Sequence, residues 1–253
     1  MAARSRGDWG RPLAGLIALG AAAAFFYLQD VHGLASSPAA EPAIPSVGQG
    51  AGMTVYFTSP VGGAQVPSTA PVEAAILESL ESADRSVDLA LYDFDLWRVR
   101  DALLACQRRG VTVRMVVESD NALQSSLVDL REAGIEIVGD GRDPLMHHKF
   151  LVIDNRLVWF GSMNLAARGV NHNDNNFMRV DSEDMAANFE REFEEMFVED
   201  RFGPLSRPDT PYPFLVIGDS AVEVAFSPED DVQARVIRRL NEATISTISW
   251  RFR

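Results

Sequence analysis

The chain has 253 residues, of which 47% are hydrophobic and 23% are charged, and this composition excludes both wholesale disorder and a polytopic membrane protein. Its formal net charge of -13 argues against a broad nucleic-acid-binding surface, because phosphate backbones are held by clustered lysine and arginine. That charge still permits a small basic active site. The length supports one full hydrophobic core and the start of another.

The N-terminal residues 1–33 are expected to form a signal peptide or a membrane anchor helix. Arg4, Arg6 and Arg11 precede a weakly polar run at 12–28, and a charged region followed by an apolar region is typical of such segments. A buried N-terminal helix is the alternative, although the run is apolar on every face. The positive flank predicts that the following chain lies outside the cytoplasm, so we expect a membrane-anchored or secreted protein, with cleavage of the segment left open.

Composition and hydrophobic spacing divide the rest of the chain. Residues 34–52 are rich in Ala, Pro, Ser and Gly and predict a flexible linker. Residues 53–200 alternate between strand and helix patterns, which predicts an α/β domain with helices on the faces of a sheet. A Pro-rich linker follows at 201–220. Strands are expected at 55–57, 87–91, 111–117, 135–138, 149–153, 157–160 and 176–180, and helices at 72–83, 98–109, 123–133 and 185–197.

A weak internal repeat begins after the second linker. The segment 226–228 resembles 57–60, and three residues of small or apolar type recur at a constant spacing further along. Residues 221–253 are therefore expected to start an incomplete second copy of the domain. The recurring residues are Leu80, Ala83 and Ser86 in the first copy and Leu240, Ala243 and Ser246 in the second.

The segment 146–164 carries the residues best suited to chemistry. Residues two apart on a strand share a face, so His147 and Lys149 are expected to point together while His148 points away. A neutral imidazole can attack phosphorus to form a covalent phosphoenzyme, and a neighbouring cation offsets the charge of a phosphodiester. The side chains of Ser162 and Asn164 are suitable donors to its non-bridging oxygens.

Lys149 is the only lysine among the 23 lysine and arginine residues of the chain. A general preference for arginine explains why lysine is rare, but not why this position retains it. A compact ammonium beside a reacting phosphate is a role for which the planar guanidinium is a poor substitute. A chance lysine on an exposed strand is the alternative.

His147, Lys149, Asp154, Gly161, Ser162 and Asn164 match the HxKx4Dx6GSxN signature of the phospholipase D superfamily. Over roughly residues 55–197 the chain resembles the branch that includes mitochondrial cardiolipin hydrolases (Zucchini) and bacterial Nuc-type endonucleases. The resemblance implies a phospholipase D-like mixed sheet with helices on both faces. It also implies two such motifs facing each other, one histidine attacking phosphorus and the other protonating the leaving group, with no metal or cofactor.

By this resemblance His147 is the nucleophile, or the general acid where it pairs with a second motif. Lys149 and Asn164 are phosphate ligands, and Ser162 is a supporting contact. Asp154, the third expected catalytic residue, orients and tunes its neighbours rather than touching substrate.

Several polar residues near the motif leave alternatives open. The single-motif relatives often carry a glutamate near Asn175, which Asp174 could replace here. His148 is expected to be structural, and His172 is a candidate substrate contact. The carboxylates Asp88, Asp93 and Asp95 could form a metal site, but a solvated strand edge is the favoured interpretation.

Three functions fit the sequence. A lipid-directed phosphodiesterase is favoured by the N-terminal segment and the acidic chain, while an endonuclease on DNA or RNA would need a basic groove. A catalytically silent, truncated half is the third, because one motif supplies only half of the acid/base machinery. A homodimer could supply the second histidine. Candidate groove residues are Arg98, Arg100, Arg108, Arg109, Arg114 and Arg142.

Overall fold

The computed structural model describes residues 25–26, 47–50, 52–59 and 70–242. The expected signal or anchor at 1–33 and the expected linker at 34–52 lie outside the described residues, apart from strands β1 (Phe25–Phe26) and β2 (Val47–Gly50) and residue Gly52. Strand β2 pairs with the following strand, so the end of the expected linker belongs to the sheet. In this described part of the chain no helix is both long enough and apolar enough to cross a membrane.

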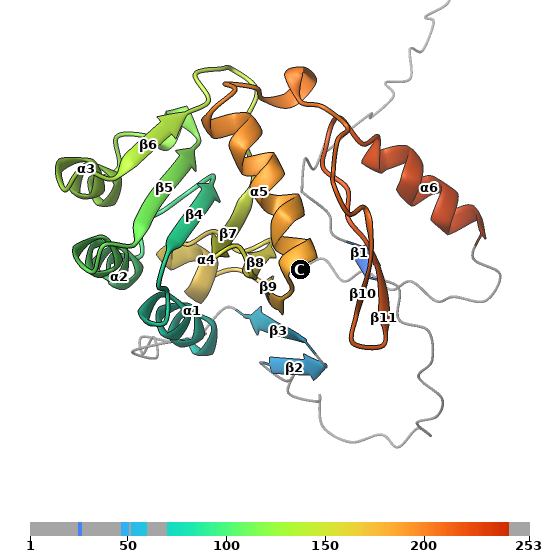
Figure 1. Ribbon diagram of the computed structural model, residues 1–253, viewed down its shortest axis with the longest axis horizontal. Coiled ribbons are helices and arrows are strands. Elements are labelled where there is room, and N and C mark those ends of the chain that lie inside the picture. The colour runs from blue at the N-terminus through green and yellow to red at the C-terminus, as the bar shows by residue number, and fades with distance from the viewer. Residues whose placement is uncertain (1–24, 27–46, 51, 60–69, 243–253) are drawn as a thin grey trace, which may run out of the picture.

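A mixed sheet forms the centre of the described domain (Figure 1). Its eight strands follow the order β2-β3-β9-β8-β7-β4-β5-β6. Strands β4, β5 and β6 run parallel, whereas the other neighbours are antiparallel. Besides β2, the strands are β3 (Met53–Thr58), β4 (Ser86–Leu91), β5 (Thr112–Val117), β6 (Glu136–Gly139), β7 (Lys149–Ile153), β8 (Leu157–Gly161) and β9 (Asn175–Asp181).

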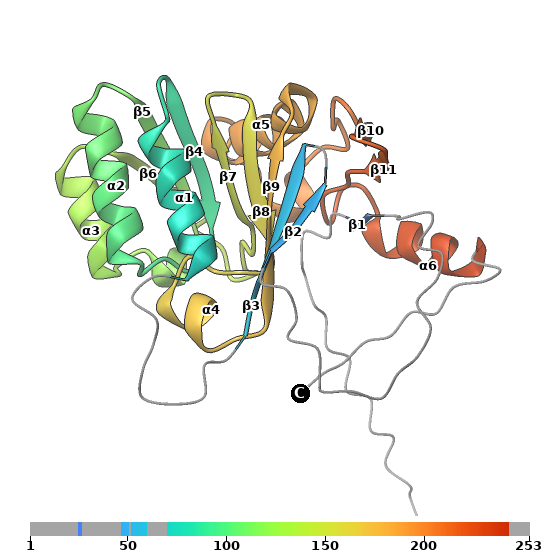
Figure 2. The ribbon, with the colours of Figure 1, turned by 90° about the horizontal axis from the view of Figure 1, so that it is seen from below.

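Helices cover both faces of this sheet, as the sequence predicts (Figures 1 and 2). Helices α1 (Pro71–Glu81), α2 (Trp97–Arg108) and α3 (Ser125–Glu132) lie on one face, and α5 (Glu183–Phe197) lies on the other. Parallel strands need a crossover connection, and α2 and α3 provide it between β4, β5 and β6. The short α4 (Ala167–Asn171), which the sequence analysis does not predict, follows β8.

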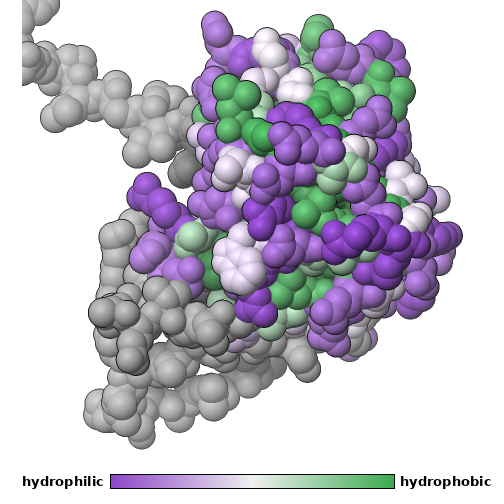
Figure 3. Space-filling view, turned by 90° about the vertical axis from the view of Figure 1, so that its left-hand side faces the viewer, coloured by the Kyte–Doolittle hydropathy of each residue, from purple (hydrophilic) through white to green (hydrophobic). Residues whose placement is uncertain are grey.

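The two faces carry separate hydrophobic cores because side chains alternate along each strand. On β7, Leu151 and Ile153 pack with the α1–α3 core, whereas Phe150 and Val152 pack with the α5 core. This alternation decides which side of the sheet each residue before Lys149 faces. The outer surface on the left-hand side of Figure 1, where α2 and α3 lie, is mainly hydrophilic with small separate apolar patches (Figure 3).

Helix α5 is fixed to the sheet by charge as well as by apolar contact. Ser182 caps its N-terminus by accepting a hydrogen bond from the Met185 N–H. Arg114 on β5 pairs with Asp88 on β4 at 2.7 Å and with Glu194 on α5 at 2.8 Å. Burial, together with the charge of Asp88, raises the pKa of Glu190 to about 8.

The C-terminal part of the described chain differs from expectation. The Pro-rich segment 201–220, predicted as a linker, contains the turn η2 (Gly203–Leu205) and strand β10 (Phe214–Ile217). This strand forms a hairpin with β11 (Ser220–Glu223), and β1 pairs with β11. Strand β10 buries Leu215 and Ile217 on alternate positions. Its four-residue pattern was too short to stand out beside the neighbouring prolines.

Helix α6 (Val232–Glu242) follows the segment 226–228, as α1 follows 57–60. It contains Leu240 of the expected repeat. Ala243 and Ser246 lie outside the described residues, so the second copy stays a prediction.

We expect Trp159→Ala to lower the free energy of unfolding by about 3–5 kcal/mol. Trp159 is fully buried, stacks between Tyr56 and Phe177, and donates its indole N–H to the Ser79 hydroxyl at 3.2 Å. Trp97→Ala is the matched control, because Trp97 is 62% exposed and its loss leaves no cavity. Urea unfolding followed by circular dichroism measures both, and equal losses would contradict the packing described for Trp159.

Candidate functional site

The residues of the motif gather at one edge of the sheet because of how the strands pair. Strand β7 begins at Lys149, which pairs with Leu91 at the end of β4. Strand β8 ends at Gly161, next to the same end of β7, since Phe150 pairs with Phe160. Residues 146–149, the segment after Leu91 and the segment after Gly161 therefore meet at this edge, which we call the catalytic edge.

Lys149 is buried, with 7% of its surface exposed. Its ammonium donates a hydrogen bond to the His147 carbonyl oxygen at 2.8 Å and lies 5.1 Å from the centre of the Tyr92 ring. Burial lowers the pKa of Lys149 to about 8, and the negative charge of Asp93 opposes this shift. A buried ammonium with so few partners is suited to binding an anion.

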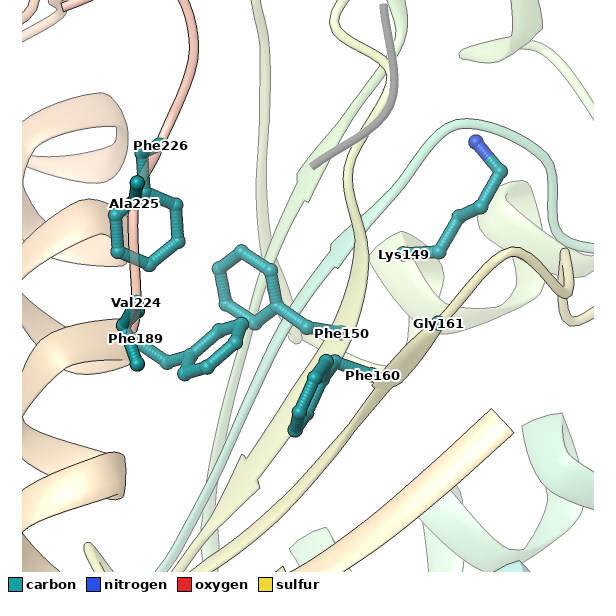
Figure 4. A pocket seen from close by; sticks show the side chains of 8 residues that line it. All are labelled: Lys149, Phe150, Phe160, Gly161, Phe189, Val224, Ala225 and Phe226. Atoms are coloured by element: carbon teal, nitrogen blue, oxygen red, sulfur yellow. The ribbon is translucent and has the colours of Figure 1, made fainter. Parts of the chain in front are cut away.

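Figure 4 shows Lys149 extending away from a cluster of phenylalanine rings. Phe150, Phe160, Phe189 and Phe226 contact one another on the α5 face. The lysine side chain therefore leaves the apolar cluster beside its backbone and reaches the opposite face of the sheet, as the strand alternation predicts.

His147 lies two residues before the start of β7, and its side chain is half-buried. Its ring packs edge to face against Tyr92, with the ring centres 4.7 Å apart. The backbone around it is held at two points: the Met146 N–H donates to Glu118 at 2.6 Å, and the His148 carbonyl accepts from the Tyr92 N–H at 3.0 Å. The residues that directly follow β4 and β5 thus hold the backbone on both sides of His147, and Tyr92 also packs against its ring.

Ser162 and Asn164 follow β8 at the same edge. The Ser162 hydroxyl contacts Asn175 Oδ1 at 3.1 Å and accepts from the Asn176 N–H at 3.1 Å. Within the described residues, the buried Oδ1 of Asn164 has no hydrogen-bond partner. Gly161 is required by close approach, because a Cβ there would collide with the backbone oxygen of Asn176.

His148 faces the α5 side, as expected from its position between His147 and Lys149. Its Nε2 lies 3.1 Å from the carboxylate of Glu192, and its ring contacts Phe150 and Phe226. A cavity of about 240 Å³ lies here, bounded by the 142–148 segment, α5, η2 and the turn at 227–228. Burial and the nearby Glu192 raise the pKa of Glu229 to about 8.

The structure does not bring Asp154 to the catalytic edge. Asp154 follows β7 at its other end, in the three-residue turn 154–156, where both it and Asn155 have positive φ. Its carboxylate accepts hydrogen bonds from the backbone N–H groups of Asp84, Arg85 and Ser86 at 2.7–3.0 Å. Partial burial would raise its pKa, but these hydrogen bonds outweigh burial and lower it. In the described part of the chain these carboxylate contacts lie away from the catalytic edge, and the expected orienting role of Asp154 stays a prediction.

The carboxylates Asp88, Asp93 and Asp95, the alternative metal site, are dispersed, and Asp88 is buried rather than solvated. Asp88 pairs with Arg114 on the α5 face, Asp93 accepts from the Gln124 side chain, and Asp95 accepts from the Ala167 N–H. In the described ranges no group of three or more histidine, cysteine or acidic side chains is arranged to hold a metal ion. His172 is exposed at the C-terminus of α4.

Two residues at the catalytic edge were missed by the sequence analysis. Tyr92 contacts both His147 and Lys149, and the buried Glu118 holds the backbone before His147. Both come directly after a predicted strand, and the carboxyl ends of parallel strands share an edge. That position was the available signal, but it points to Tyr92 and Glu118 only once β4, β5 and β7 are known to be neighbours.

Comparison with known proteins gives a match for part of the chain. Residues 76–197 match the family model described as cardiolipin synthase, PLD-like domain. Mitochondrial cardiolipin hydrolase from Xenopus laevis is 32% identical over 136 residues, which covers 53% of this chain and 65% of that protein. The human protein of that name is 33% identical over 131 residues, covering 51% of each chain. This chain therefore spans less than two thirds of the length of these curated relatives.

Among solved structures, the chain is similar to the phospholipase D family member Nuc from Salmonella typhimurium. The sequence identity is 23% and the TM-score is 0.48, with 56% of this chain and 93% of that chain covered.

We expect Asp154→Ala to lower the free energy of unfolding by about 2 kcal/mol, because three backbone donors lose a charged acceptor. Asp154→Asn keeps an oxygen acceptor and the tolerance for positive φ, so it should cost less. Since the pKa of Asp154 is lowered by folding, its contribution is present at neutral pH and is lost as the pH falls through the lowered value. Urea unfolding at pH 7 and in acid measures this. A stable Asp154→Ala protein without hydrolytic activity would instead place Asp154 in the chemistry.

Proposed function

The chain belongs to the phospholipase D superfamily through the domain at 76–197, and on that premise we propose that it hydrolyses the phosphodiester of a phospholipid. The observation that carries the proposal is the arrangement of His147 and Lys149. A buried ammonium bonded to the His147 backbone stands beside an imidazole whose ring is fixed by Tyr92. This pair supplies a nucleophile and an anion-binding cation at one edge of the sheet.

In the proposed reaction an imidazole nitrogen of His147 attacks phosphorus, and the bond from phosphorus to the leaving alcohol breaks. The product is a phosphohistidine, which water then hydrolyses to release the phosphoryl group and restore the imidazole. Lys149 binds a non-bridging oxygen and offsets its charge, and Asn164 and Ser162 are placed to add polar contacts. Asp154 serves the fold and has no role in these steps.

The leaving alkoxide needs a proton, which His147 cannot supply while it acts as the nucleophile. A second histidine from another copy of the motif would supply it, and two copies related by a closed two-fold axis would serve each other. In that arrangement one His147 attacks while the other acts as the general acid.

A phospholipid substrate is favoured over a nucleic acid by the relatives and by the arginines. The matched Xenopus and human relatives are both named mitochondrial cardiolipin hydrolase. Of the arginines that could line a groove, Arg100 pairs with Asp101 and Asp129, and Arg114 pairs with Asp88 and Glu194. Arg109, which follows the C-terminal end of α2, donates to the backbone carbonyl groups of Leu80 and Ala83. These side chains are paired on different parts of the surface and do not build a basic path to the catalytic edge.

We expect the full chain to hydrolyse bis(p-nitrophenyl) phosphate in the presence of EDTA, and His147→Ala to abolish this activity. Arg156→Ala is the control, because Arg156 is exposed and pairs with Asp181 at the opposite end of β7. Acid-labile phosphate should become bound to protein when a labelled substrate is quenched early, and this signal should be absent in His147→Ala. Vesicles containing an anionic phospholipid should be cleaved faster than single-stranded DNA or RNA. Faster cleavage of DNA or RNA would favour the alternative hypothesis of an endonuclease. A folded protein that is inactive at every protein concentration would favour the hypothesis of a catalytically silent, truncated half.

We expect the rate of hydrolysis to fall as the pH rises through about 8, because Lys149 must be charged and its pKa is lowered to about 8. Below that pH the ammonium is present, so this limb is not expected in acid. The Lys149→Arg variant should hydrolyse substrate more slowly, but its rate should not fall as the pH rises through about 8, because guanidinium stays charged throughout. A pH profile of kcat/KM measures both, and an unchanged limb in Lys149→Arg would assign it to another group.

A further inference from the structure

Tyr92 is the residue that contacts every member of the His147–Lys149 segment. Its ring packs against the imidazole of His147 at 4.7 Å with an interplanar angle of 63°, and its face lies 5.1 Å from the Lys149 ammonium. Its backbone N–H donates to the His148 carbonyl at 3.0 Å. Tyr92 directly follows Leu91, which pairs with Lys149 across β4 and β7.

The position of Tyr92 is fixed from outside the motif. Its carbonyl oxygen accepts a hydrogen bond from the Asn121 side chain at 2.6 Å. The next two residues are tied to Gln124, which donates to the Asp93 carboxylate at 2.7 Å and accepts from the Phe94 N–H at 3.2 Å. The segment between β5 and α3 therefore holds the backbone at Tyr92 in place. The Tyr92 ring lies against His147 and Lys149 from this position.

An aromatic ring in this position acts on both functional groups. The electron-rich face of the ring attracts an ammonium, most strongly where water is excluded. An edge-to-face contact restricts the rotation of a neighbouring ring such as the imidazole. Of the titratable groups around Lys149, Asp93 is the charged group that favours the ammonium, and His147 shares the Tyr92 ring.

We propose that Tyr92 is a positioning residue for the catalytic pair, whose ring fixes the His147 imidazole and holds the Lys149 side chain as an ammonium. The effect depends on the ring and not on the hydroxyl group. The catalytic consequence rests on the proposed phosphodiesterase function, whereas the effect on the charge of Lys149 is a property of the folded chain alone.

Because Lys149 is the only lysine in the sequence, its charge can be followed without ambiguity. Protein labelled with ¹³C at the lysine Cε gives one side-chain signal, whose titration reports the pKa of Lys149. That pKa is about 8 in the unmodified chain, where burial lowers it. Tyr92→Phe keeps the ring and should leave the midpoint unchanged, whereas Tyr92→Leu should lower it by about half a unit to one unit.

Tyr56→Leu is the matched control for loss of a tyrosine ring. Tyr56 stacks on Trp159 at 5.3 Å and lies on β3, which is separated from β7 by β9 and β8 in the sheet. It should lower stability while leaving the Lys149 titration in place. If Tyr92→Leu does not fold, the unmodified chain still gives a test, because the Tyr92 ring should shift the Lys149 Hε signals upfield relative to free lysine.

In kinetics with bis(p-nitrophenyl) phosphate, Tyr92→Leu should lower kcat more than it raises KM and should move the alkaline limb to lower pH. Tyr92→Phe should resemble the unmodified chain. An unshifted Lys149 titration in folded Tyr92→Leu, a Tyr92→Phe variant that behaves like Tyr92→Leu, or the absence of a ring shift would each overturn the proposal. If the unmodified chain hydrolyses nothing, the proposed function fails, while the titration still decides the role of the ring.

Discussion

The pairing of β7 on both sides is the constraint on which the rest of the structure depends. β7 lies between β4 and β8, so a slip of one residue would turn its apolar side chains to the wrong face of the sheet. Leu151 and Phe150 are buried in different cores, and neither can change sides. This fixed register carries Lys149 to one end of the strand and Asp154 to the other. The catalytic edge is a consequence of packing in the middle of the sheet.

Residues of the motif point to both faces of the sheet and have different partners on each. His147 and Lys149 meet Tyr92, whereas His148 turns toward α5 and the carboxylate of Glu192. The α5 side also carries the buried network around Arg114 and Glu190. There Arg114 pairs with Asp88 and Glu194, which holds the helix against the sheet. On the catalytic side the buried ammonium is matched mainly by a carbonyl group and a ring, which leaves it suited to an anionic substrate.

Most helices and strands between residues 53 and 200 were predictable because their apolar residues follow a helix or strand period or form an apolar run. β2, β10 and α4 were missed: β2 (VGQG) and α4 (ARGVN) lack the apolar run that marks the equally short β6, β7 and β8. The neighbouring prolines made β10 look like part of a linker. Its antiparallel pairing with β11 became visible only in the tertiary structure.

The sequence by itself determined that His147 and Lys149 share a face, because side chains two residues apart on an extended strand point to the same side. It also determined that His148 points away, and that a lone lysine stands among arginines. Only the tertiary structure decided which residues surround them. Tyr92 and Glu118 reach the motif because β4, β5 and β7 end at one edge, whereas Asp154, only five residues beyond Lys149, is carried to the opposite edge by an extended strand. A strand separates residues in proportion to their distance in sequence, while a sheet joins the ends of strands that are remote in sequence.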